Sequence, residues 1–301
     1  MRIIIPGGSG LIGRALIPAL IKDGHEVWVL SRNPQQAQLA NGAQCCAWDG
    51  KTAQGWLHLA EGAEAIINLA GENLGSGLWT AAKKQRILDS RVQAGQAIVA
   101  AVKAVNNRPR VLIQASAIGC YGVSETKTFD ESSPMGDDNL SRVCTVWEAS
   151  TEAVEALGVR RVIVRTGLLL TPTGGVLPRL VLPFKMMVGG PLGSGKQWYS
   201  WIHLVDWMAA VRFLLVNESA SGIFNLTAPE PVTQAEFGRT TAYILRCPYL
   251  LPVPAFALRG LLGEMSTLVL DGQRVLPRRL RELGFAFRYE KLHEALESLL
   301  K

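Results

Sequence analysis

The first thirteen residues constrain the fold of this chain more than any other stretch. Ile3, Ile4 and Ile5 form an apolar run without polar alternation, which is typical of a parallel β-strand buried on both faces. Glycine and serine occupy most of the next few positions, and an apolar, helix-like segment begins at Leu11. The order strand, glycine turn, helix predicts the first half of a βαβ unit.

The spacing of the glycines indicates what this turn binds. Gly7, Gly10 and Gly13 are three residues apart, and Gly8 with the last two gives the pattern G-x-G-x-x-G. Such spacing lets a pyrophosphate approach the backbone and the free N–H groups at the helix N-terminus. A turn that only redirected the chain would not need three glycines. We therefore predict a dinucleotide site built from Gly7, Ser9, Gly10, Leu11, Ile12 and Gly13.

The end of the second predicted strand, residues 25–30, bears on which dinucleotide binds. Proteins that prefer NAD commonly place an acidic residue there, about 20 positions beyond the glycine turn, where it binds the ribose 2′-hydroxyl. This chain has Ser31 and Arg32 instead. Arg32 would attract a 2′-phosphate through charge-assisted hydrogen bonds, which the Ser31 hydroxyl can join. The pattern favours NADP(H) over NAD(H).

Strands and helices continue to alternate beyond this unit. Strands are predicted at residues 44–48, 65–69, 111–115 and 162–164, and helices at 11–22, 80–105 and about 141–157. This rhythm predicts an α/β fold, a doubly wound parallel sheet of the Rossmann type. Leu69 and Ala70 end the fourth strand, where small side chains leave room for the cofactor. Asp49 follows the third strand and either caps a turn or bonds the adenine edge.

The composition of the chain changes after Arg165. Proline and glycine become frequent, so we expect residues 166–205 to form part of a substrate lobe. Pro178 and Pro183 interrupt the apolar run 176–188, which favours a lobe packed over the cofactor rather than a membrane-surface segment. The predicted organisation is an NADP-binding domain over residues 1–230, including that part of the lobe, and a smaller C-terminal lobe over residues 231–301.

Charge and cysteine content limit the partners. The net charge of +6 permits an anionic ligand, but no basic run is interleaved with aromatic residues, so no nucleic-acid partner is expected. Five cysteines without C-x-x-C spacing and four scattered histidines argue against a metal site and for reduced thiols. The first strand leaves no room for a signal peptide, and no apolar stretch approaches ~18 residues. We expect a soluble, cytoplasmic protein without a membrane partner.

Several motifs resemble those of the extended short-chain dehydrogenases/reductases, the superfamily of nucleotide-sugar epimerases and dehydratases. Besides the glycine turn, they are Asn68–Gly71, Ser116–Gly122, Asp130–Pro134, Trp201–Asp206 and Gly222–Leu226. An atypical branch, the YfcH-like epimerase family proteins, is similar also in Ala70–Asn73, Cys144–Glu148 and a C-terminal domain of unknown function, here Ser266–Leu299. The resemblance covers nearly the whole chain and implies an extended Rossmann fold and NADP binding, without an established reaction.

The proton-transfer groups of that superfamily are replaced here. Its members use a serine after the fifth strand and a Tyr-x-x-x-Lys pair on the next helix, where the lysine lowers the phenol pKa. The corresponding positions carry Ala117, Cys144 and Glu148. Cys144 and Glu148 are therefore candidate catalytic residues, although the carboxylate would disfavour a Cys144 thiolate. Alternatively, Cys144 packs as a small hydrophobic residue and Glu148 pairs with an arginine.

Further expectations concern side chains around the cofactor. By resemblance, Arg91 on the helix after the fourth strand touches the cofactor phosphates; otherwise it is a surface arginine. Ala117 is expected among the cofactor-binding residues. His203 and Tyr121 are expected to position the lobe and to pack beneath the substrate pocket, respectively.

Two functional hypotheses follow. The first is an NADP-dependent oxidoreductase or epimerase that acts on a small carbonyl or sugar-like ligand through nonstandard acid–base groups. The second is a non-catalytic NADP(H)-binding protein that senses redox state or scaffolds a partner. The glycine turn is compatible with both hypotheses, and the replaced catalytic groups favour the second.

Overall fold

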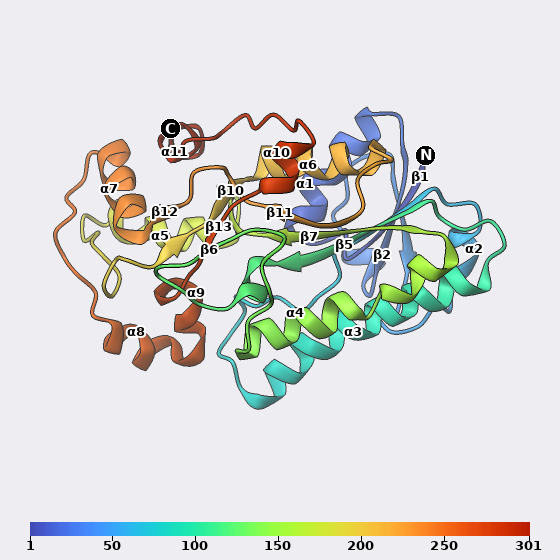
Figure 1. The fold of residues 1–301 in the computed structure, drawn as a ribbon, viewed down its shortest axis with the longest axis horizontal. Coiled ribbons are helices and arrows are strands. Elements are labelled where there is room, and N and C mark those ends of the chain that lie inside the picture. The colour runs from blue at the N-terminus through green and yellow to red at the C-terminus, as the bar shows by residue number, and fades with distance from the viewer.

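A seven-stranded, entirely parallel sheet forms the centre of the computed structural model, which describes residues 1–301 (Figure 1). The strand order is β11–β7–β5–β4–β1–β2–β3. The strands are β1 (Arg2–Pro6), β2 (Glu26–Ser31), β3 (Ala43–Ala47), β4 (Ala65–Asn68), β5 (Val111–Ala117), β7 (Arg160–Thr166) and β11 (Gly222–Leu226). The predicted doubly wound parallel sheet is confirmed, with β11 as a further strand at one edge.

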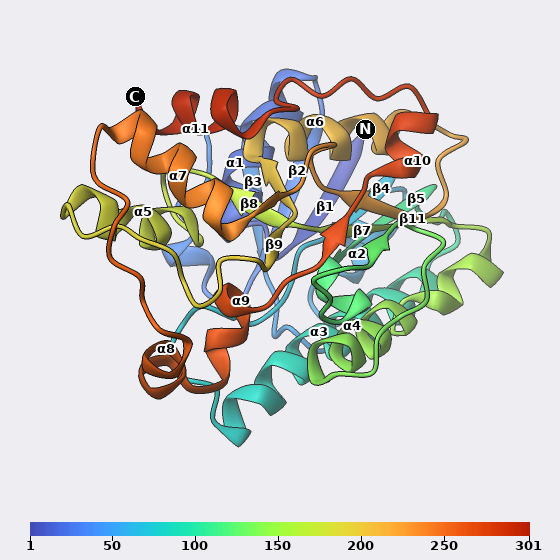
Figure 2. The same ribbon diagram turned by 60° about the vertical axis from the view of Figure 1, so that its left-hand side comes forward.

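The alternation of side chains along β1 explains its isoleucine run. Ile3 and Ile5 face a core formed with α1 (Leu11–Lys22) and α6 (Leu204–Val216). Ile4 points to the opposite face, where it joins a second core with α3 (Ala81–Ala104). Figures 1 and 2 show α1 and α6 above the sheet and α3 with α4 (Asn139–Ala149) below it. Both faces of β1 are therefore buried, as a parallel strand requires.

The helix predicted over residues 141–157 consists of two elements. Helix α4 ends at Ala149, and the 3₁₀ helix η3 covers Glu152–Leu157. The Ser150 hydroxyl donates to the Trp147 carbonyl at 2.6 Å, and the Thr151 hydroxyl donates to the Glu148 carbonyl at 3.4 Å. Because these side chains bond the carbonyls that a continuous helix would use, the helix is interrupted here.

A second, smaller layer of structure lies beyond the carboxyl ends of the strands. Leu170, Trp201, Phe237 and Leu296 are among the residues of its own hydrophobic core. Its elements are β8 (Leu168–Leu170), α5 (Leu177–Lys185), β9 (Trp198–Tyr199), β10 (Trp201–His203), β12 (Val232–Thr233), α7 (Gln234–Leu245), α8 (Ala255–Leu262), η4 (Gly263–Ser266), α9 (Thr267–Leu270) and α11 (Leu292–Leu300). In Figure 1, α5, α7 and α8 form the left-hand part of the molecule.

The last thirty residues return to the large domain before they finish in the small layer. Strand β13 (Arg274–Val275) pairs with β6 (Thr128–Phe129), and α10 (Arg278–Glu282) contributes Leu280 to the main core. Helix α11 then packs against α7. The segment 231–301, predicted as one lobe, is thus divided between the two layers.

Three further short elements complete the chain. They are η1 (Pro34–Gln36), α2 (Leu57–Ala60) and η2 (Ile118–Tyr121). No helix combines the length and the apolar character needed to cross a membrane.

Candidate functional site

The glycine turn between β1 and α1 is closely packed and leaves backbone donors free. Gly7 has a φ of +76°, and a Cβ there would lie 2.7 Å from the Leu69 carbonyl. A Cβ on Gly13 would lie 2.3 Å from the carbonyl oxygen of Gly8. The N–H groups of Leu11, Ile12 and Gly13 have no acceptor within the chain. These glycines therefore cannot be replaced without moving backbone, and the helix N-terminus presents donors to an anion.

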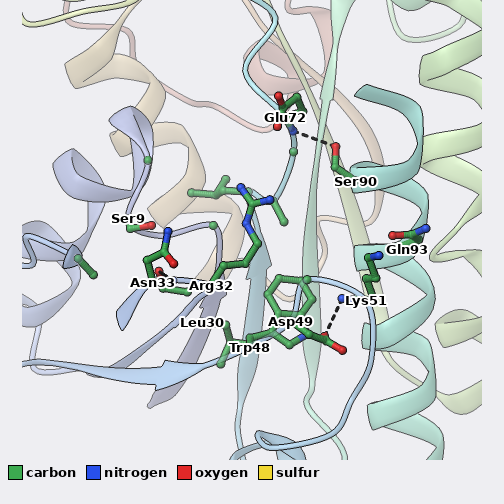
Figure 3. A pocket seen from close by; sticks show the side chains of 18 of the residues that line it. Ser9, Leu30, Arg32, Asn33, Trp48, Asp49, Lys51, Glu72, Ser90 and Gln93 are labelled. Carbon is green, nitrogen blue, oxygen red and sulfur yellow. Dashed lines mark hydrogen bonds between the residues drawn. The ribbon is translucent and has the colours of Figure 1, made fainter. Parts of the chain in front are cut away.

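A cleft of about 650 Å³ opens at the carboxyl ends of the central strands, beside the turn (Figure 3). Of the predicted cofactor-binding residues, Gly7, Ser9, Gly10, Ser31, Arg32, Leu69 and Ala70 line it. Leu11, Ile12 and Gly13 form the first turn of α1 behind it, whereas Arg91 and Ala117 do not line it. Sequence reasoning missed the lining residues Asn33, Trp48, Lys51, Ser90 and Gln93. Lys51 follows the third strand in a polar turn, and this position was the one sequence feature that could have indicated its place in the cleft.

The carboxylates that line the cleft all have partners in the protein. The Asp49 carboxylate accepts from the Lys51 and Thr52 N–H groups at 2.8 and 2.9 Å, so this side chain caps its own turn. Glu72 pairs with Lys83 at 2.7 Å. Asp89 accepts from Gln85 at 2.7 Å.

Of the three cations that line the cleft, Arg86 lies 3.9 Å from the Glu72 carboxylate and the other two are less constrained. The Arg32 and Lys51 side chains are exposed and form no ion pair within the chain. Figure 3 shows Arg32 pointing into the cleft from one wall, with Lys51 on the far side and Trp48 below. The charge left available to a ligand is therefore positive.

Arg91 supports the wall of the cleft from behind. Its side chain is buried, and Nη1 donates to the carbonyls of Ile87 and Glu72 at 2.9 and 3.2 Å. The guanidinium carbon lies 4.7 Å from the ring centroid of Trp147 on α4. A Cβ on Gly71 would lie 3.0 Å from the same carbon. Arg91 thus holds the loop after β4 in place, and it is not a surface arginine.

Glu148 lies in a buried polar network at the end of β5. Arg165 on β7 binds its carboxylate with two hydrogen bonds of 2.9 Å, and the Ser116 hydroxyl donates to it at 2.6 Å. The side chains of Arg165 and Glu148 are 2% and 7% exposed. This arrangement corresponds to the alternative in which Glu148 pairs with an arginine, and it occupies both carboxylate oxygens.

Cys144 lies one helical turn before Glu148 and faces the same strand. Its Sγ is 3.7 Å from the Ala117 carbonyl oxygen, to which the thiol donates. Burial, with the nearby charge of Glu148, raises the pKa of this thiol to about 11. The structure thus brings Ala117, Cys144 and Glu148 together, with Cys144 protonated at neutral pH.

His203 and Tyr121 are both buried and both engaged. Nδ1 of His203 accepts from the Val205 N–H at 3.0 Å and caps α6. The Tyr121 hydroxyl donates to the Asn225 amide oxygen at 2.8 Å, and its ring stacks on Phe129. Asp206 accepts from the Arg288 and Tyr289 N–H groups at 2.7 and 2.9 Å, which fastens the C-terminal segment. These side chains hold elements together around the site.

The parallel sheet, the close glycine turn and the free helix N-terminus define an NAD(P)-binding protein of the Rossmann type. The chain belongs to the NAD dependent epimerase/dehydratase family, whose sequence model matches residues 3–227. Residues 253–299 match a domain of unknown function, DUF1731.

Relatives of similar length support this assignment. Epimerase family protein YfhF of Bacillus subtilis is 40% identical over 310 residues, covering 100% of this chain and 98% of that protein. A chloroplastic SDR39U1 homolog of Arabidopsis thaliana is 39% identical over 311 residues, covering 100% of this chain and 87% of that protein. The crystal structure of human epimerase family protein SDR39U1 with NADPH superposes with a TM-score of 0.87 at 31% identity, covering 99% of both chains.

Proposed function

We propose that this protein binds NADP(H), with the pyrophosphate at the glycine turn and the 2′-phosphate held by Ser31, Arg32 and Lys51. The observation that carries the proposal is the unpaired Arg32 side chain directly after β2, where NAD-preferring proteins place a carboxylate. A guanidinium can bind phosphate with two parallel hydrogen bonds. The NADPH in the human SDR39U1 structure supports the same cofactor.

Titration with NADPH and NADH tests this assignment. We expect NADPH to bind more tightly, and Arg32→Glu to reduce that preference by roughly ten- to a hundredfold, as the loss of charged hydrogen bonds implies. Arg239→Glu is the matched control, because this exposed residue on α7 carries the same charge change away from the cleft. Equal binding of both cofactors, or an unchanged ratio in Arg32→Glu, contradicts the proposal.

We further propose that the bound cofactor exchanges hydride with a small carbonyl or sugar-like ligand, without the serine, tyrosine and lysine common in the superfamily. A second cavity of about 530 Å³ supports a ligand beside the cofactor. Asn73 and Gly75 line this cavity, and the preceding Glu72 lines the cofactor cleft, so one short loop separates the two.

A non-catalytic NADP(H) sensor or scaffold is the second candidate. The ion pair of Glu148 with Arg165 favours it, because both carboxylate oxygens already accept hydrogen bonds from the protein. NADPH labelled at its transferable hydrogen, incubated with the protein and cell extract, separates the two candidates. Protein-dependent loss of label supports hydride transfer, whereas retention across varied extracts supports the sensor.

A further inference from the structure

The second cavity lies between the small layer and the loop after β4. Its walls come from α5, from the segment of α8, η4 and α9, and from residues Asn73 and Gly75. It adjoins the glycine turn: a Cβ on Gly174 would lie 3.0 Å from the Leu11 side chain, and Gly175 lines the cavity itself. A ligand there would lie beside the cofactor.

The lining of this cavity differs in character from that of the cofactor cleft. Of its 20 lining residues 13 are hydrophobic, against 5 of 21 in the cleft. They include Leu180 on α5, Val253 in the loop before α8 and Leu258 on α8. Arg179 is its one ionisable side chain. A nucleoside diphosphate, with two charged phosphates and a polar sugar, would leave most of its polar groups without partners here.

The side-chain groups of Asn73, Gln234 and Arg179 that have no partner in the chain are donors. The Asn73 side-chain oxygen accepts from the Gly75 N–H at 2.8 Å, and that of Gln234 accepts from the Leu192 N–H at 3.0 Å. Both amide NH₂ groups are therefore free to donate. Arg179 uses Nη1 on the Gly75 carbonyl at 3.0 Å, and its other nitrogens have no partner in the chain. A matching ligand presents an acceptor to these donors and apolar surface to the rest.

We propose that the second cavity binds an apolar carbonyl compound, with its oxygen toward Arg179 and Asn73, and not a nucleotide sugar. This inference rests on the proposed function in so far as it names the substrate class of the same site. Burial of alkyl groups supplies the affinity, and the donors orient the carbonyl group.

Binding of a chain-length series tests the proposal without requiring turnover. Methyl ketones of six, eight and ten carbons are titrated into the full protein saturated with NADPH, with UDP-glucose as the polar competitor. Each added methylene should tighten binding by about three- to fourfold, the ratio expected for its burial. UDP-glucose should neither bind nor displace the ketones at the same concentrations. Affinity independent of chain length, or displacement by UDP-glucose, overturns the proposal.

Matched variants locate the binding. Leu258→Gln should weaken the ten-carbon ketone by at least roughly tenfold, because it places an amide in the apolar wall. Leu261→Gln is the control: it makes the same change on the same helix, at a residue that is 74% exposed and outside the cavity. Arg179→Gln should weaken every ketone by a similar factor and leave the chain-length dependence unchanged. Equal losses in Leu258→Gln and Leu261→Gln count against this cavity.

Ketone binding and loss of label from NADPH are measured separately, so failure of the apolar site can be distinguished from failure of the proposed hydride transfer. Ketone binding with the expected chain-length dependence, but without loss of label from NADPH, retains the apolar site and refutes hydride transfer. Label loss with nucleotide sugars, and no ketone binding, refutes the apolar site alone.

Discussion

Arg165 binds the carboxylate of Glu148 through two parallel hydrogen bonds, Nε to Oε1 and Nη2 to Oε2, each 2.9 Å long. The resemblance to the short-chain dehydrogenases/reductases predicts that Glu148 stands where their Tyr-x-x-x-Lys pattern has lysine. The negative charge of Glu148 is balanced by Arg165 on strand β7. The pair also ties α4 to β5 and β7 beneath the site, because Ser116 donates to the same carboxylate.

Glu148→Gln should destabilise the protein strongly. The change leaves the buried Arg165 guanidinium without a counter-charge, and removal of one partner of a buried ion pair commonly costs about 3–5 kcal/mol. Urea unfolding measures the loss. Glu264→Gln is the control, because its exposed pair with Lys84 should contribute no more than about 0.5 kcal/mol. Similar losses in both variants would show that the buried pair contributes little.

Cys144 should remain unmodified by iodoacetamide in the folded protein at neutral pH. Its thiol is buried, and a pKa raised to about 11 leaves very little thiolate to react. Cys45, Cys46 and Cys247 are only partly buried and provide internal controls. Mass spectrometry of the labelled peptides, before and after unfolding in urea, gives the comparison. Labelling of Cys144 in the folded protein at the rate of Cys45 contradicts a protonated, buried thiol.

The features that were predicted correctly from sequence depend on local geometry. Three isoleucines in a row require a strand buried on both sides, and closely spaced glycines require a turn that packs against Leu69. The parallel, doubly wound arrangement of the sheet followed from the alternation of strands with helices.

What could not be predicted depends on partners distant in sequence. Arg165 follows Glu148 by 17 residues and lies on a different element, so the sequence does not specify their contact. Lys51 and Gln93 line the same cleft, although one follows β3 and the other lies on α3. The break after Ala149 depends on side chains of Ser150 and Thr151 that bond carbonyls of their own helix, and the apolar periodicity does not reveal it.

Gly13→Ala should damage both the fold and cofactor binding. Its Cβ would lie 2.3 Å from the Gly8 carbonyl oxygen and 2.5 Å from the Gly8 Cα, so the glycine turn must shift. Forced backbone displacement of this kind costs about 1–3 kcal/mol, and we expect NADPH affinity to fall by at least roughly tenfold. Urea unfolding and NADPH titration measure the two effects.

Gly260→Ala is the matched control for that substitution. Gly260 lies within α8, and a Cβ there would meet no atom within 4 Å. Alanine in a helix interior is favoured over glycine by about 0.5–1 kcal/mol, so this variant should be neutral or more stable. If Gly13→Ala behaves like Gly260→Ala, the turn is not as closely packed as the structure describes.

His203 should make the protein less stable as the pH falls from 6.5 to 4. Burial, assisted by the charge of Arg288, lowers the pKa of His203 to about 4, below the value of about 6.5 expected in the unfolded chain. Between these values the unfolded state binds more protons, so the free energy of unfolding decreases toward low pH. The physical cause is local: a proton on Nδ1 would remove the acceptor for the Val205 N–H at the start of α6.

His203→Asn is the control for this prediction, because asparagine retains an acceptor suited to a helix N-cap and does not titrate. The free energy of unfolding of the two proteins, measured by urea from pH 7 to 4, should therefore diverge by no more than about 3 kcal/mol, with the wild type losing more. Parallel pH profiles would mean that His203 titrates alike in the folded and unfolded states, and that the α6 cap does not depend on its neutral form.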